Sequence, residues 1–433
     1  MFQNNLLMGA AAAASGGASL VSVGGSALYV TGNSEKLTKT YASAGNRRTW
    51  TFSTWVYRGK LGTTQGILSA DVGGGNWAEI RLHSTDYLWV YFQNAGDGNF
   101  QTSPLLRDIG WYHIVVALDT TQAIAENRCK IYINGERVTT FVAKTNPSLN
   151  LEQSINDDVA HNIGWTGSGS EYLDGYLAET VFIDGSQLAP TSFGAYDSSG
   201  LYWTPLSSTT IKALTFGDNG SYLDNTTNAQ TDASGEGNNW TNNNTVTTIA
   251  HSPTNSYPIQ NSLTLTNSYP SSLTEGNLKQ TGSSSGSFAS GTLATLPCDG
   301  GGKFYWEIKV LGTYTTNGYS SIGVAPMDLP RVDNVDGNGN FCLPGQQDYQ
   351  GVSTTFNTGT TTNLRANSLG TNSNIGSAYA VSTGAFMQIA FDSATQKVWF
   401  GKDNTWYNSG DPANGTNPTV TLTATDKTWF PWI

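Results

Sequence analysis

Carboxylate side chains are the first candidates for chemistry, because two carboxyl groups roughly 5–9.5 Å apart can hydrolyse a glycosidic bond. On one strand such a pair needs i, i+2 or i, i+4 spacing, since only alternate side chains share a face. Glu79, Glu179 and Glu307 each stand alone in an apolar, strand-like run. Their spacing predicts no glycosidase pair.

Histidines and cysteines offer no better catalytic centre. The chain has four histidines, no His-Glu-x-x-His sequence and no cysteine–histidine pair at a useful spacing. Cys129, Cys298 and Cys342 are far apart and odd in number, which predicts neither a metal site nor a disulfide framework. His113 lies in an apolar run, where we expect a hydrogen-bonded core residue. We therefore predict a protein that is not an enzyme and holds no cofactor.

One loop offers calcium as an alternative to this cofactor-free reading. The oxygen ligands of Asp333, Asp336, Asn338 and Asn340 have a spacing similar to that of a calcium loop. The segment lacks a glycine at the sixth position counted from Asp336 and lacks the closing glutamate. Asp and Asn next to Gly are also common turn formers, so these four residues are only weak metal candidates.

Aromatic residues in loops are the more natural binding groups. Their rings pack on the apolar faces of sugars, while neighbouring Asn, Asp and Gly residues supply hydrogen-bonding groups. The alternative at each position is packing in the core or at its rim. The candidates for binding a glycan or a partner are Trp77, Trp165, Tyr314, Tyr319, Trp406 and Tyr407.

The composition predicts an all-β protein and excludes some partners. The 433 residues suffice for two or three domains. Charged residues are 12% of the chain, against about 25% in ordinary proteins, while 13 Trp, 20 Tyr and 16 Phe require packed regions. A net charge of −11 argues against binding nucleic acid, which needs clustered Lys and Arg. No apolar run reaches the roughly 18 residues of a membrane span, so we expect no membrane insertion.

Residues 1–25 form a small, apolar segment without the positive charge of a secretion signal, since the first basic residue is Lys36. We expect this peptide to be ordered and to anchor the chain to another protein. Its apolar anchor residues would be Phe2, Leu6, Leu7 and Met8. The alternative is a strand tucked into its own domain.

Short strand-like runs separated by turn residues follow from Ser26 onward. The run Trp111–Leu118 is almost wholly apolar, which predicts a strand buried on both faces. Asn134-Gly135 predicts a type I′ hairpin turn, because both residues accept positive φ. No run of 12 or more residues has a helical apolar period, so helices should be short and few. The other predicted strands here are 49–57, 77–82, 87–92, 130–133, 137–142 and 177–183.

The chain divides into four predicted segments. Residues 1–25 are the anchor, 26–190 a first β-sandwich, 191–262 an Asn/Thr/Gly-rich connector that packs through isolated aromatics, and 263–433 a second sandwich. Residues 334–384 are expected to be long loops with one or two strands. The strands predicted in the second sandwich are 303–310, 320–325, 385–391, 397–401 and 428–433.

The first sandwich resembles the laminin-G and pentraxin-like jelly roll of the concanavalin-like superfamily. The resemblance covers about 150 residues and includes Thr51-Phe-Ser-Thr-Trp55-Val, Trp111-Tyr-His113, Ile131-Tyr-Ile-Asn134-Gly135 and Gly175-Tyr-Leu-Ala178-Glu179. It implies that Glu179 is a structural acidic residue. Glycosidases of this fold carry a Glu-x-Asp-x-Glu strand, and no such strand is present.

The second sandwich is similar to SPRY domains. Gly302-Lys-Phe-Tyr305-Trp306-Glu307-Ile resembles their opening strand, and Ser321-Ile-Gly323-Val-Ala, Val398-Trp-Phe400-Gly and Trp429-Phe-Pro431 resemble later ones. The resemblance implies that Glu307 is the family's own strand residue. It also implies that Tyr314 and Tyr319 lie at a partner-binding loop edge.

The whole chain resembles virion proteins of marine tailed bacteriophages. The matching segments include Phe2-Gln-Asn-Asn-Leu-Leu-Met-Gly9, Val181-Phe-Ile-Asp-Gly185-Ser-Gln-Leu-Ala-Pro190 and Gly235-Glu-Gly-Asn-Asn-Trp240. The resemblance implies a virion location, on the tail or the capsid surface. It further implies contact with other virion proteins through the anchor peptide, and a homo-oligomer such as a trimer.

We therefore predict two tandem antiparallel β-sandwiches in a non-enzymatic tail fibre or adhesin that binds a host-surface glycan or protein. Three alternatives remain open. The first is a capsid fibre or decoration protein, the second is a secreted carbohydrate-active enzyme on the concanavalin-like fold, and the third is a SPRY-type peptide adaptor.

Overall fold

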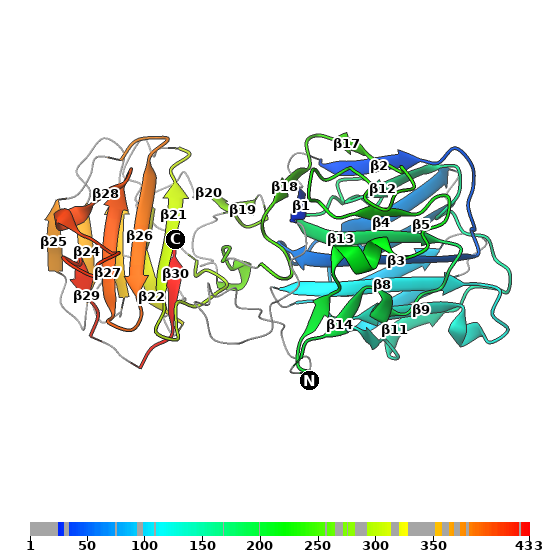
Figure 1. The fold of residues 1–433 in the computed structure, drawn as a ribbon, viewed down its shortest axis with the longest axis horizontal. Helices are drawn as coiled ribbons and strands as arrows, with labels where there is room; N and C mark the ends of the chain where they lie inside the picture. Colours follow the sequence, from blue (N-terminus) through cyan, green and yellow to red (C-terminus); the bar gives the residue numbers. More distant parts are fainter. Residues whose placement is uncertain are drawn as a thin grey trace. The chain divides into compact units, whose positions relative to one another are not determined.

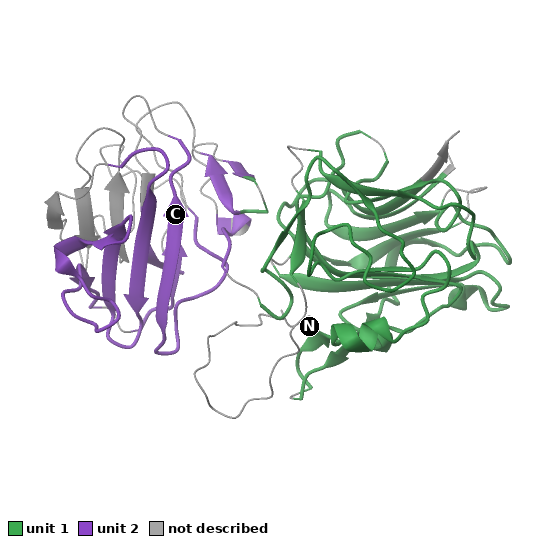
Figure 2. Cartoon of the chain, turned by 45° about the horizontal axis from the view of Figure 1, so that its top comes forward, with its two compact units in different colours: residues 1–257, 274–277 green, residues 258–273, 278–433 purple. Residues whose placement is uncertain are grey.

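The computed structural model divides into two compact units (Figure 2). The first comprises residues 1–257 and 274–277, and the second comprises residues 258–273 and 278–433. Both are built from antiparallel sheets, which confirms the predicted all-β class. The structure describes residues 25–29, 34–73, 76–92, 98–107, 110–167, 169–198, 200–255, 258–264, 272–274, 276–281, 292–312, 320–327, 351–356, 363–367, 373–377, 381–423 and 426–433.

The first unit packs two sheets of eight strands each (Figure 1). Sheet A has the order β10(Glu136–Arg137), β9(Cys129–Ile133), β8(Trp111–Asp119), β3(Thr49–Arg58), β13(Gly175–Asp184), β1(Ser26–Tyr29), β18(Thr247–Ile249), with β16(Ser221–Leu223) also paired to β13. Sheet B has the order β11(Phe141–Thr145), β7(Asn99–Leu105), β6(Tyr87–Phe92), β5(Asn76–Leu82), β4(Gln65–Gly73), β12(Ala160–Ile163), β2(Lys36–Thr40), β17(Thr241–Asn243).

The predicted hairpin between β9 and β10 is present. Ile133 pairs with Glu136, and Asn134 and Gly135 between them have φ angles of 51° and 82°. Both values are positive, as a type I′ turn requires. The backbone twist of a type I′ turn matches the right-handed twist of the flanking strands, so a two-residue connection suffices.

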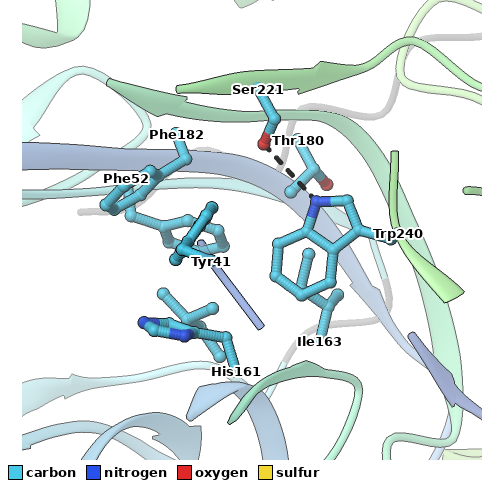
Figure 3. A pocket seen from close by; sticks show the side chains of 9 residues that line it. Tyr41, Phe52, His161, Ile163, Thr180, Phe182, Ser221 and Trp240 are labelled. Atoms are coloured by element: carbon cyan, nitrogen blue, oxygen red, sulfur yellow. Dashed lines mark hydrogen bonds between the residues drawn. The ribbon is translucent and has the colours of Figure 1, made fainter. Parts of the chain in front are cut away.

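The core of the first unit lies between sheets A and B. Trp50 of β3 and Phe92 of β6 meet edge to face there, with ring centroids 6.0 Å apart. This core contains a small cavity of about 10 Å³ (Figure 3). Its mostly apolar lining includes Tyr41, His161 and Trp240, whose indole N–H points toward Ser221 Oγ at 3.5 Å. The cavity is closer in size to one water molecule than to a ligand.

A second layer covers the outer face of sheet A. Val115 of β8 and Val181 of β13 pack there against Phe193, Ile211 and Phe216. Ile211 belongs to α1(Ser208–Lys212), the single α-helix among the described residues, which lies in front of β13 and β3 in Figure 1. β8 and β13 are therefore buried on both faces, as the apolar run Trp111–Leu118 predicted for β8.

The covering layer consists of residues that the sequence predicted as a connector. Residues 191–255 belong to the first unit, and they supply β16 and β18 to sheet A and β17 to sheet B. They also form the hairpin of β14(Gly194–Tyr196) with β15(Trp203–Pro205). Strands of three residues show too little alternation to be recognised in a sequence, which is why this segment looked like an extended linker.

The second unit packs two five-stranded sheets, with Phe391 and Trp429 in contact across the core at 6.4 Å. The described parts of residues 334–384 contain three strands, where the sequence predicted one or two. A separate hairpin pairs β19(Ser272–Thr274) with β20(Lys279–Thr281). One sheet has the order β21(Lys303–Lys309), β26(Phe386–Asp392), β27(Lys397–Lys402), β28(Thr405–Trp406), with β29(Val420–Thr421) also paired to β27. The other has the order β25(Ser373–Ser377), β24(Asn363–Asn367), β23(Gly351–Phe356), β22(Ser320–Pro326), β30(Trp429–Trp432).

Two further predictions concerned the N-terminal anchor and membrane-spanning segments. The anchor residues Phe2, Leu6, Leu7 and Met8 lie outside the described residues. In the part of the chain that the structure describes, no helix has the length and apolar character needed to cross a membrane.

Candidate functional site

The outer face of sheet B carries a cluster of aromatic rings. Along β6, residues Tyr87, Trp89 and Tyr91 are partly exposed, whereas the intervening Leu88, Val90 and Phe92 are fully buried in the core. Trp77 of the neighbouring β5 is also partly exposed. Because directly paired residues share a face, the pairings Glu79–Tyr91 and Arg81–Trp89 place these side chains on the same outer surface. We call Trp77, Tyr87, Trp89 and Tyr91 the aromatic platform.

The platform rings contact one another and are held by polar neighbours. Tyr91 lies 6.0 Å from Trp77 and 5.8 Å from Trp89 between ring centroids. The Trp89 indole N–H donates to Asn99 Oδ1 at 2.8 Å. His83 stacks on Tyr87 with centroids 4.4 Å apart. Such contacts fix the rings before any ligand arrives, which lowers the entropic cost of binding.

Arg81 connects the platform to two carboxylates. Its guanidinium carbon lies 4.1 Å from the centroid of the Trp89 ring, a cation–π contact. Its Nη1 lies 2.8 Å from Glu79 Oε2 and 3.4 Å from Glu171 Oε2. Arginine is permanently charged. Arg81 therefore lies between the two carboxylates and joins them to the ring of Trp89.

The loop after β12 lies beside the platform. Ser69 Oγ donates to the carbonyl of Trp165 at 2.9 Å, and Thr166 Oγ1 donates to Glu171 Oε2 at 2.9 Å. Gly66 allows this close approach, because a Cβ there would lie 2.2 Å from the Trp165 carbonyl carbon. The loop thus brings Glu171 to Arg81 although the two residues are far apart in sequence.

Trp165 itself is engaged inside this loop. Its ring stacks on Tyr172 with centroids 5.6 Å apart, and Lys36 Nζ lies 3.6 Å from its centroid. Partial burial lowers the pKa of Lys36. The predicted binding residues Trp77 and Trp165 are therefore in the same sandwich, but only Trp77 belongs to the platform.

The remaining predicted site residues fall in or beside the second unit. Trp406 lies on β28 with its ring 6.2 Å from that of Tyr305. Tyr407 is partly buried against the core of the second unit. The other candidates lie outside the described residues, namely Tyr314, Tyr319, Asp333, Asp336, Asn338 and Asn340.

Sequence reasoning missed Tyr87, Trp89 and Tyr91. The run Tyr87–Phe92 forms the predicted strand, but the predicted binding residues all came from expected loops. The available signal was the strict alternation of Tyr, Trp and Tyr with Leu, Val and Phe. Aromatic residues at every second position of one strand form one continuous row on the outer face.

The buried histidines are structural. His113 Nδ1 accepts from the Trp203 indole at 2.9 Å, so His113 Nε2–H donates to Ser53 Oγ. His161 Nε2 accepts from the Asn156 amide, and its Nδ1–H donates to the Val159 carbonyl. Burial lowers the pKa of His113 to about 3 and that of His161 to about 4. Within the described residues, no group of three or more His, Cys, Asp or Glu side chains is arranged to hold a metal.

Glu179 is also part of the interior. It lies at a bulge of β13 with a φ of 49° and accepts a hydrogen bond from the Tyr222 hydroxyl. Burial raises the pKa of Glu179 to about 8, and the nearby Asp224 carboxylate adds to this effect. Only 4% of the residue is exposed, so it cannot contact a large substrate in this conformation.

Comparisons with known proteins agree with the architecture of the first unit. Residues 30–189 match the Laminin_G_3 family model, described as the concanavalin A-like lectin/glucanases superfamily. This match confirms the concanavalin-like jelly roll. The superfamily includes both lectins and glucanases by name, so the match leaves open whether the fold binds or cleaves sugars. No curated protein matches the chain.

Three solved structures illustrate the similarity at the level of the fold. A Bacteroides ovatus protein described as carbohydrate-binding is 15% identical with a TM-score of 0.38, covering 53% of this chain and 60% of its own. A Trypanosoma rangeli sialidase is 14% identical with a TM-score of 0.24, covering 33% and 21%. The SPRY domain of human HERC1 is 14% identical with a TM-score of 0.22, covering 33% and 72%. These similarities are too low to carry function, which rests on this chain's own residues.

Proposed function

We propose that this chain is a non-enzymatic glycan-binding protein and that the aromatic platform of the first unit is its sugar-binding surface. The observation that carries the proposal is the row of Tyr87, Trp89 and Tyr91, which β6 presents on the open face of sheet B. Partly exposed rings offer flat apolar surfaces on which sugar rings can stack. The adjoining Arg81, Asn99 and Glu171 supply the polar groups that bind hydroxyls and set specificity.

The charges around the platform support a neutral sugar. Arg81 lies between Glu79 and Glu171, and Lys36 is held over Trp165 beside them. Positive and negative groups therefore balance within the surface. An acidic sugar would have to displace an existing carboxylate from Arg81, so we propose binding of uncharged saccharides.

Hydrolysis is the competing function, because Glu79 and Glu171 share one arginine nitrogen. A glycosidase needs one carboxyl group that is protonated and can donate its proton to the leaving group. Both carboxylates are instead engaged by Arg81 Nη1, and only 3% of Glu79 is exposed, which leaves Glu79 little access to a glycosidic bond. The geometry therefore favours binding without cleavage.

A binding assay on the folded full-length chain tests this proposal. The probe is a printed array of neutral plant, algal and bacterial oligosaccharides, with acidic oligosaccharides beside them. Trp77→Ala and Tyr91→Ala each remove a platform ring and should weaken binding about tenfold. Tyr196→Ala is the matched control, because this aromatic residue is 46% exposed but lies outside the platform.

Two results would overturn the proposal. One is that the folded chain binds none of the oligosaccharides on the array. The other is that Trp77→Ala and Tyr91→Ala both bind with unchanged affinity. Release of new reducing ends from bound polysaccharide, lost in Glu171→Gln, would instead establish the hydrolase.

The placement of this binding protein on a phage particle is a further part of the proposal. It is supported by the resemblance of the chain to phage virion proteins and by its low charge, which suits a surface in salt. A tail fibre or adhesin is preferred, with a capsid decoration protein as the alternative and a trimer as the expected oligomer. Deleting residues 1–25 should abolish incorporation into particles while both units stay folded. Normal incorporation of that deletion would exclude the anchor.

A further inference from the structure

The second unit has its own pair of aromatic rings, one exposed and one partly exposed, on the outer face of its β21–β26–β27–β28 sheet. Tyr305 of β21 is 52% exposed. Trp406 of β28 lies 6.2 Å away between centroids, with the ring planes at 67°. Two rings at a steep angle form a corner, and we call Tyr305 and Trp406 the aromatic corner.

Polar side chains on the neighbouring strands hold this corner in place. The Tyr305 hydroxyl donates to Glu307 Oε1, and Gln388 Nε2 contacts the Tyr305 hydroxyl at 2.6 Å and Glu307 Oε1 at 3.1 Å. Gln388 also makes two hydrogen bonds with Asn404. Its Nε2 donates to Asn404 Oδ1 at 3.0 Å, and the backbone N–H of Asn404 donates to Gln388 Oε1 at 2.7 Å. Only 3% of Gln388 is exposed, so the network has a buried centre beneath an exposed rim.

Gly401 leaves room for Trp406 to lie close to the sheet. Gly401 pairs with Gln388 on one side and with Trp406 on the other. A Cβ at Gly401 would lie 2.9 Å from Trp406 Cε3, so any larger residue would displace the indole. Residues from four strands therefore hold the two rings of the corner in place, whereas two aromatic rings exposed by chance would have no such support.

The charges on this face select an uncharged ligand. Lys303, Tyr305, Glu307 and Lys309 are all exposed and alternate along β21, so they share one face. The Glu307 carboxylate repels an anion placed against Tyr305. The ammonium groups of Lys303 and Lys309, at the two ends of β21, repel a cation. The hydrogen bonds that Glu307 accepts from Tyr305 and Gln388 weaken the attraction of its carboxylate for a cation.

We propose that the aromatic corner is a second saccharide site, which binds one ring of a neutral oligosaccharide. The sugar would stack on Tyr305 or Trp406, and its hydroxyls would donate to Glu307 and exchange hydrogen bonds with Asn404. This site shares no residue with the platform, so the proposal does not depend on the function proposed for the first unit. Together the two sites make the chain bivalent for polysaccharides.

Fluorine NMR of the full-length chain labelled with 5-fluorotryptophan tests the second site directly. The Trp406 signal is assigned with Trp406→Phe, and the probes are β-1,3- and β-1,4-linked hexasaccharides of glucose, galactose and mannose. At least one hexasaccharide should shift the Trp406 signal in a saturable way. Tyr305→Ala should weaken that response about tenfold. Phe386→Ala, an exposed aromatic on the same sheet outside the corner, is the matched control and should leave it unchanged.

Variants of the first unit separate the two proposals. Tyr91→Ala should leave the Trp406 response intact while it weakens binding at the platform. The Glu307→Gln variant should also accept an acidic oligosaccharide such as hexagalacturonate, because Lys303 and Lys309 remain and the opposing charge is gone. No Trp406 response to any neutral hexasaccharide, an equal response in Tyr305→Ala, or a response to a lysine-rich peptide instead would each overturn the second site.

Discussion

The indole N–H of Trp203 donates a hydrogen bond to Nδ1 of His113 at 2.9 Å. His113 lies in β8 of sheet A, and Trp203 lies in β15 of the layer that covers this sheet. The imidazole stacks on Trp55 with ring centroids 4.8 Å apart, and the centroid of the Trp203 ring lies 6.0 Å away. This contact fixes the tautomer of the histidine and ties residues 191–255 to the jelly roll.

Removing this hydrogen bond should destabilise the first unit. Trp203→Phe keeps an aromatic ring but leaves His113 Nδ1 without its indole donor, which should lower the free energy of unfolding by about 1–3 kcal/mol. Trp240→Phe is the matched control, since its indole reaches Ser221 only at 3.5 Å. Urea unfolding monitored by circular dichroism measures both. Equal losses in the two variants would show that ring volume, not the histidine contact, matters.

The turn before β10 should tolerate no side chain at Gly135. This residue has a φ of 82°, and a Cβ there would lie 2.6 Å from Trp203 Cε3. Gly62 has a similar φ of 72° but nothing within 4 Å of its Cβ position. Gly62→Ala should therefore cost only about 1 kcal/mol of backbone strain, and Gly135→Ala clearly more. Thermal unfolding of the two variants measures this difference. Equal decreases in Tm would mean that Trp203 can move away from position 135 at no cost in stability.

Stability should be greatest near pH 6.5. Burial lowers the pKa values of His113 and His251 to about 3 and that of His161 to about 4, against 6.5 when unfolded. Below pH 6.5 the unfolded chain binds more protons than the folded one, so stability falls as pH falls. Each histidine contributes up to about 1.4 kcal/mol per pH unit. Urea midpoints measured from pH 4.5 to 8.5 test this, and a flat profile between pH 5 and 6.5 would contradict it.

Glu179 should make stability fall as pH rises, with a weaker dependence on pH than that of the histidines. Its pKa is raised from 4.5 to about 8 in the folded state, so the folded protein holds a proton that the unfolded chain has lost. Stability should therefore fall as pH rises through this window, which is visible above pH 6.5 where the histidines no longer titrate. Glu179→Gln imitates the protonated carboxyl and should flatten the profile between pH 6.5 and 8. An unchanged slope in this variant would place the titration on another group.

The sequence by itself determined the all-β class and the positions of most long strands. Period-2 alternation and Asn-Gly turns are local signals, so β3, β6, β8 and the β9–β10 hairpin were readable without any tertiary information. The two-sided burial of β8 was also readable, because a strand covered on both faces has few polar positions. The identity of its cover was not readable, since strands as short as β14–β18 carry almost no pattern.

Only the tertiary structure decided which aromatic residues gather on one surface. Trp77, Trp89 and Tyr91 come from two strands whose register places them together, and Tyr305 meets Trp406 across β26 and β27. Loop position alone had favoured Trp165, whose ring is in fact engaged by Tyr172 and Lys36. Strand pairing between distant segments depends on burial of the whole sheet, and this is why exposure of a single ring cannot be inferred from its neighbours in sequence.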